Sequence, residues 1–193
     1  MSDRRGSRRV LLLGGARSGK SVAAEAIAAR AAGDDPVVYV ATGDSRPDDP
    51  EWAARVAAHK IRRPVHWRTV ETYDPGPVLA AGGVVLVDCM ALWLTRAMDA
   101  LDAWDDDNWA GTAARHLGVR VNALVNAWSA APGTVIAVSN EVGLGVVPAT
   151  VAGRRFRDEL GRLNVRLAAA SDEVYLVVAG RLLPLADPTA HLL

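Results

Sequence analysis

The chain has 193 residues, and half of them are hydrophobic, which is enough for the core of one α/β domain. Its 22 basic residues balance 22 acidic ones, so it lacks the basic excess typical of a nucleic-acid-binding protein. The single cysteine, Cys89, excludes an internal disulfide and suits a reducing cytoplasm.

Short apolar runs alternate with Ala-rich segments along the chain. The apolar runs predict β-strands at 9–13, 36–42, 65–71, 83–90, 133–140 and 173–180, with a further short one in "RLLPL". The Ala-rich segments predict helices at 20–32, 49–60 and 149–170, and a long helical region over 91–131 that breaks near "DAWDDDN". The stretches "RPDDP" and "ETYDPGP" are predicted to be loops.

This alternation predicts an α/β fold with a mostly parallel central sheet flanked by helices. No repeat, linker or change of composition divides the chain, so we expect a single domain over residues 9–193 after a flexible, solvated tail at 1–8. The apolar run "VLLL" is too short for a signal peptide or a membrane span. We therefore expect a cytoplasmic protein with no membrane span.

The segment "GGARSGKS" fits the pattern G-x-x-x-x-G-K-[ST] at every fixed position, between a predicted strand and a predicted helix. Glycines let backbone N–H groups turn toward phosphate oxygens, and the N-terminus of the following helix favours anions. We therefore expect a P-loop NTPase fold of the RecA-like type. The residues expected to bind a nucleoside triphosphate are Gly14, Gly15, Ala16, Arg17, Ser18, Gly19, Lys20 and Ser21.

Three side chains are expected to act on the phosphates or on Mg²⁺. Lys20 is expected to bridge the β- and γ-phosphates, and the Ser21 hydroxyl to hold Mg²⁺. Asp88 ends the apolar run "VVLVD", where it completes the Mg²⁺ site or orients a water molecule. We interpret Lys20 and Asp88 as catalytic; for Asp88 the alternative is a surface aspartate that ends a strand.

His59 lies at the end of a predicted helix, close to the cations Lys60, Arg62 and Arg63. These cations suit a polyphosphate, and they favour a neutral imidazole that can attack phosphorus. A solvated histidine near the C-terminal dipole of a helix is the alternative, and spacing alone does not decide between the two. No two His or Cys residues show metal-ligand spacing, so no structural zinc is expected.

Six segments follow one another along the chain: "GGARSGKS", "YVATGD", "DPEWAARVAAHKIRRPVHWRTVE", "VLVDCMALWLT", "VSNEVGLGVVP" and "RRFRDELGRLNVRLAAASDEVYLVVAG". Together they resemble the bifunctional adenosylcobinamide kinase / adenosylcobinamide-phosphate guanylyltransferase family of cobalamin biosynthesis. The resemblance covers about residues 10–185, and "NEVGLG" followed by Pro148 is far more specific than the phosphate loop.

The resemblance implies two reactions at one nucleotide site. In the first, the aminopropanol hydroxyl of adenosylcobinamide receives the γ-phosphate of ATP or GTP. In the second, GMP passes from GTP to adenosylcobinamide phosphate, giving adenosylcobinamide-GDP and pyrophosphate. His59 ends an R-[IV]-x-x-H segment at 55–59, so the resemblance implies that it carries GMP covalently. A homotrimer is also implied.

The resemblance further implies that the nucleotide is bound by residues beyond the phosphate loop, namely Ala41, Thr42, Gly43, Lys60, Ile61, Arg62, Arg63 and Glu71. Glu71 is a candidate acceptor for the guanine N1–H and N2 amine. Asn140 and Glu141 are expected near cobinamide or Mg²⁺, whereas Arg157 and Asp158 are either a helix-surface pair or a subunit contact. Trp52 and Val165 replace the Met and Gln usual in the family, which concerns packing rather than chemistry.

Three other functions remain open at this level. The first is a phosphotransferase without a covalent step, which would not retain the α-phosphate of GTP on the protein. The second is a RecA-like motor on nucleic acid, against which the zero net charge argues. The third is a nucleotide sensor without catalysis, which would not turn over with cobinamide.

Overall fold

The computed structural model describes residues 7–43 and 48–187, apart from the side chains of residues 51, 52, 55, 58 and 59. The strands are β1 (Arg8–Gly14), β2 (Val37–Ala41), β3 (Arg68–Glu71), β4 (Val84–Asp88), β5 (Thr134–Asn140), β6 (Glu173–Val178) and β7 (Arg181–Pro184). The helices are α1 (Lys20–Ala32), α2 (Pro50–Arg62), α3 (Gly76–Ala80), α4 (Met90–Asp99), α5 (Asp106–Asn108), α6 (Ala114–Ala130) and α7 (Val151–Ala169). A π-helical turn, η1 (Trp109–Ala113), joins α5 to α6.

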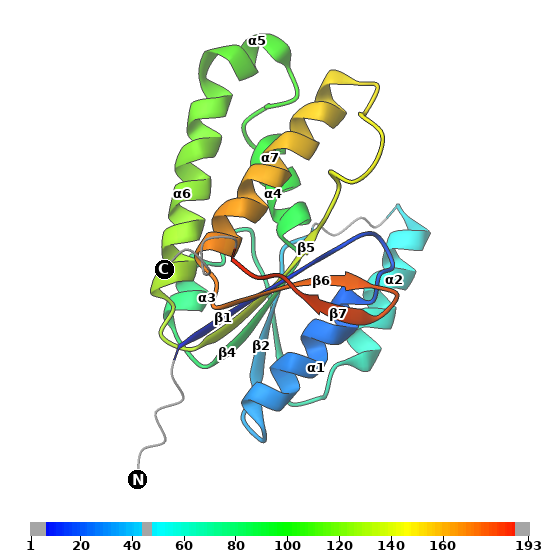
Figure 1. The fold of residues 1–193 in the computed structure, drawn as a ribbon, viewed down its shortest axis with the longest axis vertical. Coiled ribbons are helices and arrows are strands. Elements are labelled where there is room, and N and C mark those ends of the chain that lie inside the picture. Colours follow the sequence, from blue (N-terminus) through cyan, green and yellow to red (C-terminus); the bar gives the residue numbers. More distant parts are fainter. Residues whose placement is uncertain (1–6, 44–47, 188–193) are drawn as a thin grey trace.

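The strands form one sheet in the order β3-β2-β4-β5-β1-β6-β7. Every neighbouring pair is parallel except β6 and β7, which form an antiparallel hairpin at one edge. Figure 1 shows α1 and α2 on one side of the sheet and α4, α6 and α7 on the other. The predicted fold class, a mostly parallel sheet flanked by helices, is confirmed.

The centre of the sheet forms the core because helices cover it on both faces. Val10, Leu11 and Leu12 of β1 have no exposed surface, and neither do Val135 and Ile136 of β5. All five are apolar, and the valines and the isoleucine are also β-branched, which is the reason these segments form buried strands. Packing therefore fixes the position of β1, which leads into the phosphate loop, and of its neighbour β5.

Two sequence predictions need correction. The first strand begins at Arg8, one residue before the predicted start, so Arg8 belongs to β1 and not to a solvated tail. The stretch "ETYDPGP" was predicted to be a loop throughout, but α3 begins at Gly76 within it. Pro75 precedes the helix, and the Asp74 carboxylate accepts a hydrogen bond from the Gly76 amide at 3.1 Å. This Asx-type turn starts a helix too short to show a hydrophobic period.

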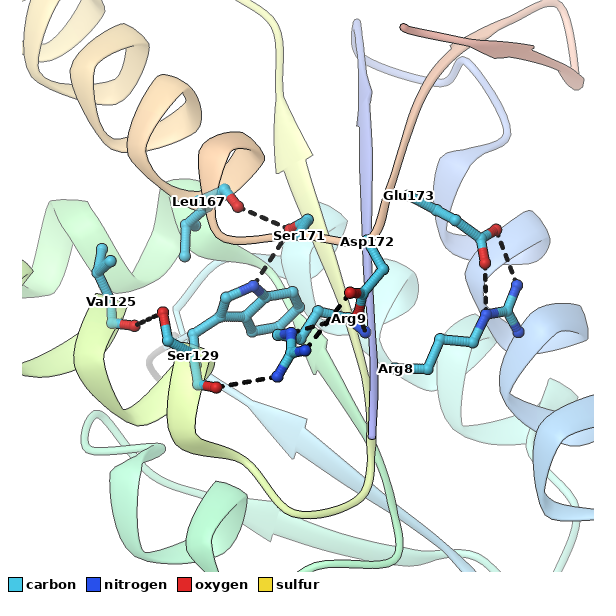
Figure 2. Close-up of polar contacts among 9 residues, drawn as sticks. Arg8, Arg9, Val125, Ser129, Leu167, Ser171, Asp172 and Glu173 are labelled. Atoms are coloured by element: carbon cyan, nitrogen blue, oxygen red, sulfur yellow. Dashed lines mark hydrogen bonds and ion pairs between the residues drawn. The ribbon is translucent and has the colours of Figure 1, made fainter. Parts of the chain in front are cut away.

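The amino-terminal ends of β1 and β6 are held by ion pairs (Figure 2). The Arg8 guanidinium donates to both carboxylate oxygens of Glu173, at 2.6 and 2.8 Å. The backbone amide of Arg9 donates to Asp172 at 2.7 Å, and its side chain donates to the Ser129 carbonyl at 2.9 Å. These contacts tie α6 and the turn before β6 to the amino-terminal end of β1, which is the end opposite the phosphate loop.

Within the described residues, no helix is long and apolar enough to cross a membrane.

Candidate functional site

The carboxyl ends of five parallel strands bring predicted site residues to one edge of the sheet. These strands end at Gly14, Ala41, Glu71, Asp88 and Asn140. In the register of the sheet, Gly14 pairs with Asn140, while Ala41 pairs with both Glu71 and Asp88. Because α/β sheets bind ligands beyond the carboxyl ends of their strands, this edge is the candidate site. Strand β5 separates the phosphate-loop strand from the strand that ends in Asp88.

The phosphate loop, residues 14–21, runs from the end of β1 through residues 15–19 into the first turn of α1. Gly19 precedes α1 with a φ of 95°, a left-handed conformation that glycine adopts without strain. The buried Lys20 side chain folds back and donates to the Gly15 carbonyl at 3.0 Å. Among the described residues, no side chain caps α1, and the buried Ser18 hydroxyl has no hydrogen-bond partner. Uncapped amides and a spare hydroxyl fit an anion at this helix N-terminus.

The β6–β7 hairpin supports this loop, a contact that sequence reasoning did not predict. The Gly180 amide donates to the Ser18 carbonyl at 2.8 Å. A Cβ atom at Gly14 would lie 2.7 Å from the Val177 carbonyl oxygen, and one at Gly19 would lie 3.1 Å from the Gly180 Cα. The first and last glycines of the loop are therefore needed for close packing against the hairpin. The only signal for it in the sequence is the Ala-Gly turn after "EVYLVV".

Asp88 ends β4 half-buried, in a polar cluster. The Tyr39 hydroxyl donates to its Oδ2 at 2.7 Å. Burial, and then the charge of Asp88, raise the pKa of Tyr39, so this hydroxyl stays protonated and donates. Thr42 is fully buried and donates to the Cys89 carbonyl at 2.7 Å. Burial raises the pKa of the Cys89 thiol to about 11; the charge of Asp88 adds to this shift, and the nearby Lys20 opposes it.

The donor set at this edge fits Mg²⁺. Ser21 lies half-buried in the first turn of α1 and supplies a hydroxyl, while Asp88 supplies a carboxylate. In nucleotide enzymes Mg²⁺ is bound through one or two such protein groups together with substrate phosphates. Among the described residues, no group of three or more His, Cys, Asp and Glu side chains is placed to hold a metal ion.

The C-terminal turn of α2 is tied to α1 and to β3 by its cations. The Lys60 ammonium lies 3.7 Å from Glu71 Oε1 at the end of β3, and both side chains are exposed. Arg62 donates to both carboxylate oxygens of Glu25 on α1, at 3.2 and 3.1 Å, and this contact is the main cause that raises the Arg62 pKa. The Arg63 guanidinium lies over the Tyr39 ring, 3.3 Å from its centroid.

His59 precedes Lys60 in α2, and its side chain lies outside the described part of the structure. Ile61 is highly exposed. Ala41 ends β2 with Gly43 two residues further on, at the same edge as the phosphate loop. The Lys60–Glu71 ion pair shows that the C-terminal turn of α2 lies at this edge of the sheet.

The residues after β5 also lie against the phosphate loop. Asn140 pairs with Gly14 in the sheet, and the Glu141 amide donates to the Gly14 carbonyl at 3.1 Å. Arg157 and Asp158 lie next to each other on α7 and form an ion pair at 2.8 Å. The structure thus places Asn140 and Glu141 beside the phosphate loop at this edge of the sheet.

Comparisons with known proteins agree with this geometry. Residues 10–185 match the family described as cobinamide kinase / cobinamide phosphate guanyltransferase. The bifunctional adenosylcobalamin biosynthesis protein CobU of Salmonella typhimurium is 42% identical over 179 residues, which cover 89% of this chain and 96% of that protein. The bifunctional adenosylcobalamin biosynthesis protein CobP of Pseudomonas aeruginosa is 41% identical over 184 residues, covering 92% and 96%.

A solved structure of an ATPase from a bacterial type III secretion system superposes with a TM-score of 0.51 at 13% identity, over 88% of this chain and 50% of that one. This likeness shows the P-loop NTPase fold alone. The family match over residues 10–185, together with the relatives above 40% identity, shows that the chain belongs to the cobinamide kinase / cobinamide phosphate guanyltransferase family.

Proposed function

We propose that the chain carries out both reactions of its family at the single edge described above, and that His59 carries GMP between GTP and adenosylcobinamide phosphate. The observation that carries the proposal is the convergence of three elements. The phosphate loop, Asp88 and the Lys60–Glu71 ion pair all lie at the carboxyl ends of neighbouring parallel strands. Substrate phosphates and the helix that bears His59 would therefore meet at one place.

In the kinase reaction, ATP or GTP lies with its phosphates on the loop of residues 14–21. The Lys20 ammonium exchanges its contact with the Gly15 carbonyl for the β- and γ-phosphate oxygens. Ser21 and Asp88 would hold Mg²⁺, which when bound withdraws negative charge from the phosphates. The substrate hydroxyl oxygen forms a bond to the γ-phosphorus while the bond to the β-bridging oxygen breaks, and the hydroxyl proton leaves to water.

In the guanylyl transfer, an imidazole nitrogen of His59 bonds to the α-phosphorus of GTP. The bond from that phosphorus to the bridging oxygen breaks, and pyrophosphate leaves with the electron pair. The cations Lys20, Lys60, Arg62 and Arg63 offset its charge. A phosphate oxygen of adenosylcobinamide phosphate then attacks the same phosphorus and releases the imidazole. Glu71 would accept hydrogen bonds from guanine after leaving Lys60.

The test is to incubate the protein with GTP labelled at the α-phosphate and to measure acid-labile label on the denatured chain. We expect label on the wild type and none on His59→Ala. The matched control is His66→Ala, since His66 is an exposed histidine seven positions further on that has no proposed role. Label that persists in His59→Ala would refute the covalent step, and loss of label in His66→Ala would show that the assay does not report His59.

The kinase half is tested separately with γ-labelled ATP or GTP and adenosylcobinamide. Because His59 has no part in that reaction, we expect His59→Ala to phosphorylate adenosylcobinamide at a rate within about threefold of wild type. Lys20→Met is expected to lose both reactions, since the phosphate loop serves both. Loss of the kinase reaction in the single variant His59→Ala would argue against separate roles for His59 and Lys20.

The family resemblance also supports a homotrimer, while the zero net charge and the single cysteine support a protein that acts in the cytoplasm and does not bind nucleic acid. The loop after β5 exposes Leu144 and Val146, with 82% and 95% of their surface accessible, and apolar side chains of this kind suit a subunit interface. Light scattering on the purified protein measures the mass directly, and a monomeric mass of 20.4 kDa would exclude the trimer.

A further inference from the structure

We propose that Tyr39 is a positioning residue of the nucleotide site, which orients the Asp88 carboxylate through its hydroxyl and holds the end of α2 through its ring. This inference rests on the proposed role of Asp88 toward Mg²⁺. Tyr39 lies in β2, two residues before Ala41, which pairs with Asp88 in β4. Its side chain therefore runs along the neighbouring strand and reaches the carboxylate diagonally.

The hydroxyl contact is more than the packing of a core aromatic. Tyr39 is only 3% exposed, and a buried tyrosine hydroxyl needs a hydrogen-bond partner. Its partner is a carboxylate oxygen at 2.7 Å, and hydrogen bonds to ionised acceptors are stronger than bonds between neutral groups. With Oδ2 held in this way, rotation of the Asp88 side chain is restricted, and the direction of Oδ1 is set before any metal ion arrives.

The ring contact joins this acid to α2. Arg63 directly follows α2. Its guanidinium carbon lies 3.3 Å from the centroid of the Tyr39 ring, and its Nη1 donates to Thr69 Oγ1 of β3 at 3.1 Å. A cation over an aromatic face is attracted to the ring, more strongly when water is excluded. The preceding Arg62 is tied to Glu25 of α1. The Tyr39 side chain thus contacts both Asp88 at the end of β4 and Arg63, the residue that directly follows the helix carrying His59.

The variant Tyr39→Phe tests the hydroxyl, because it keeps the ring and the Arg63 contact and removes one oxygen atom. We expect the affinity for Mn²⁺, titrated by electron paramagnetic resonance in the presence of a non-hydrolysable GTP analogue, to fall about tenfold, as is typical when a partner of a metal ligand is removed. Binding of the same analogue in EDTA is expected to stay unchanged, since the phosphate loop is intact. This readout requires no turnover.

The matched control is Tyr175→Phe. Tyr175 also donates to a carboxylate, Glu173 Oε2 at 2.6 Å, but on β6 at the amino-terminal end of the sheet. We expect its Mn²⁺ affinity to equal that of wild type. Wild-type Mn²⁺ affinity in Tyr39→Phe, or an equal loss in Tyr175→Phe, would overturn the inference.

Asp88→Asn separates this inference from the proposed function. If Asp88→Asn loses Mn²⁺ affinity and Tyr39→Phe does not, the positioning role of Tyr39 is wrong and the role of Asp88 stands. If Asp88→Asn binds Mn²⁺ as wild type does, the proposed role of Asp88 is wrong, and the hydroxyl part of the inference falls with it.

The ring contact is tested with Tyr39→Leu, which removes the ring as well as the hydroxyl. We expect GMP labelling of the protein from GTP to be at least threefold slower than in Tyr39→Phe, because Arg63 and the end of α2 lose their support. Thermal unfolding of both variants identifies a folding defect in Tyr39→Leu. If there is one, the Mn²⁺ affinity of Tyr39→Phe against that of wild type decides the inference alone. Equal labelling rates in two folded variants would show that the ring has no positioning role.

Discussion

The buried hydrogen bond between Ser139 and Asn164 gives a quantitative prediction about the strand that separates the two halves of the site. The Ser139 hydroxyl, at the end of β5, donates to Asn164 Oδ1 on α7 at 2.6 Å. Asn164 Nδ2 in turn donates to the Asn140 carbonyl at 3.0 Å. Ser139 is 0% exposed and Asn164 is 5% exposed, so water does not readily replace either partner. We expect Asn164→Ala to destabilise the fold strongly for a single polar residue.

The magnitude follows from these two contacts. Each hydrogen bond contributes about 1 kcal/mol net, and a stranded buried hydroxyl at Ser139 adds roughly 1–2 kcal/mol. The free energy of unfolding should therefore fall by about 3–4 kcal/mol in Asn164→Ala. For a domain of this length, that corresponds to a lowering of Tm by roughly 6–16 °C.

Urea denaturation followed by circular dichroism measures the change. The exposed Asn126→Ala on α6 is the control and should change stability by less than about 0.5 kcal/mol. In the double variant Ser139→Ala/Asn164→Ala the shared hydrogen bond is lost only once and no hydroxyl is stranded, so its loss should be smaller than the sum of the single losses by about 2–3 kcal/mol. Additive losses, or a loss below about 1 kcal/mol in Asn164→Ala, would refute the reasoning.

Three further outcomes are expected. Arg155→Ala should lower the free energy of unfolding by about 2–4 kcal/mol in urea, because the buried guanidinium donates to the Ala103 carbonyl at 2.6 Å and to Asp106 at 2.5 Å; a change below about 1 kcal/mol would contradict this. In Gly19→Ala, the positive φ and the 3.1 Å approach to the hairpin should distort the phosphate loop and weaken binding of a fluorescent GTP analogue at least tenfold, whereas unchanged affinity would show that the loop tolerates a side chain. The hydrogen bond from Arg8 lowers the pKa of Glu173, and the ion pair stabilises the fold by at most about 1 kcal/mol. This stabilisation is fully present above the ordinary glutamate pKa of about 4.3, and it is lost as pH falls through the lowered pKa. Tm measured against pH should therefore show Glu173→Gln less stable than wild type at neutral pH and equal to it in acid, and a constant difference across that range would refute the assignment.

The sequence predicted best what depends on local pattern. Helix α1 has the predicted bounds, 20–32, because a phosphate loop must open a helix and Gly33 ends it. The strand that ends in Asp88 was recognised from its continuous apolar run. The five strand ends could be expected at one edge because strand–helix alternation implies a parallel sheet.

Contacts that depend on strand order could not be predicted. Tyr39 lies within "PVVYVAT" and looks like any core aromatic until β2 and β4 are known to be neighbours. Likewise, nothing in the sequence tells that the turn at Gly180 lies on the phosphate loop, because this requires β6 to pair with β1. Helix α3 was missed because five residues give too little periodicity against an Asp-Pro-Gly turn signal.

The hydrogen bond from Gly180 to Ser18 has a consequence for the synthesis of this protein. The ribosome makes the phosphate loop well before its supporting hairpin, so a nascent chain holds an unsupported loop until β6 and β7 have been made. We expect tight nucleotide binding only from chains that have emerged far enough for β6 to pair with β1. Retention on a GTP resin would thus sort finished polypeptides from those that stopped early.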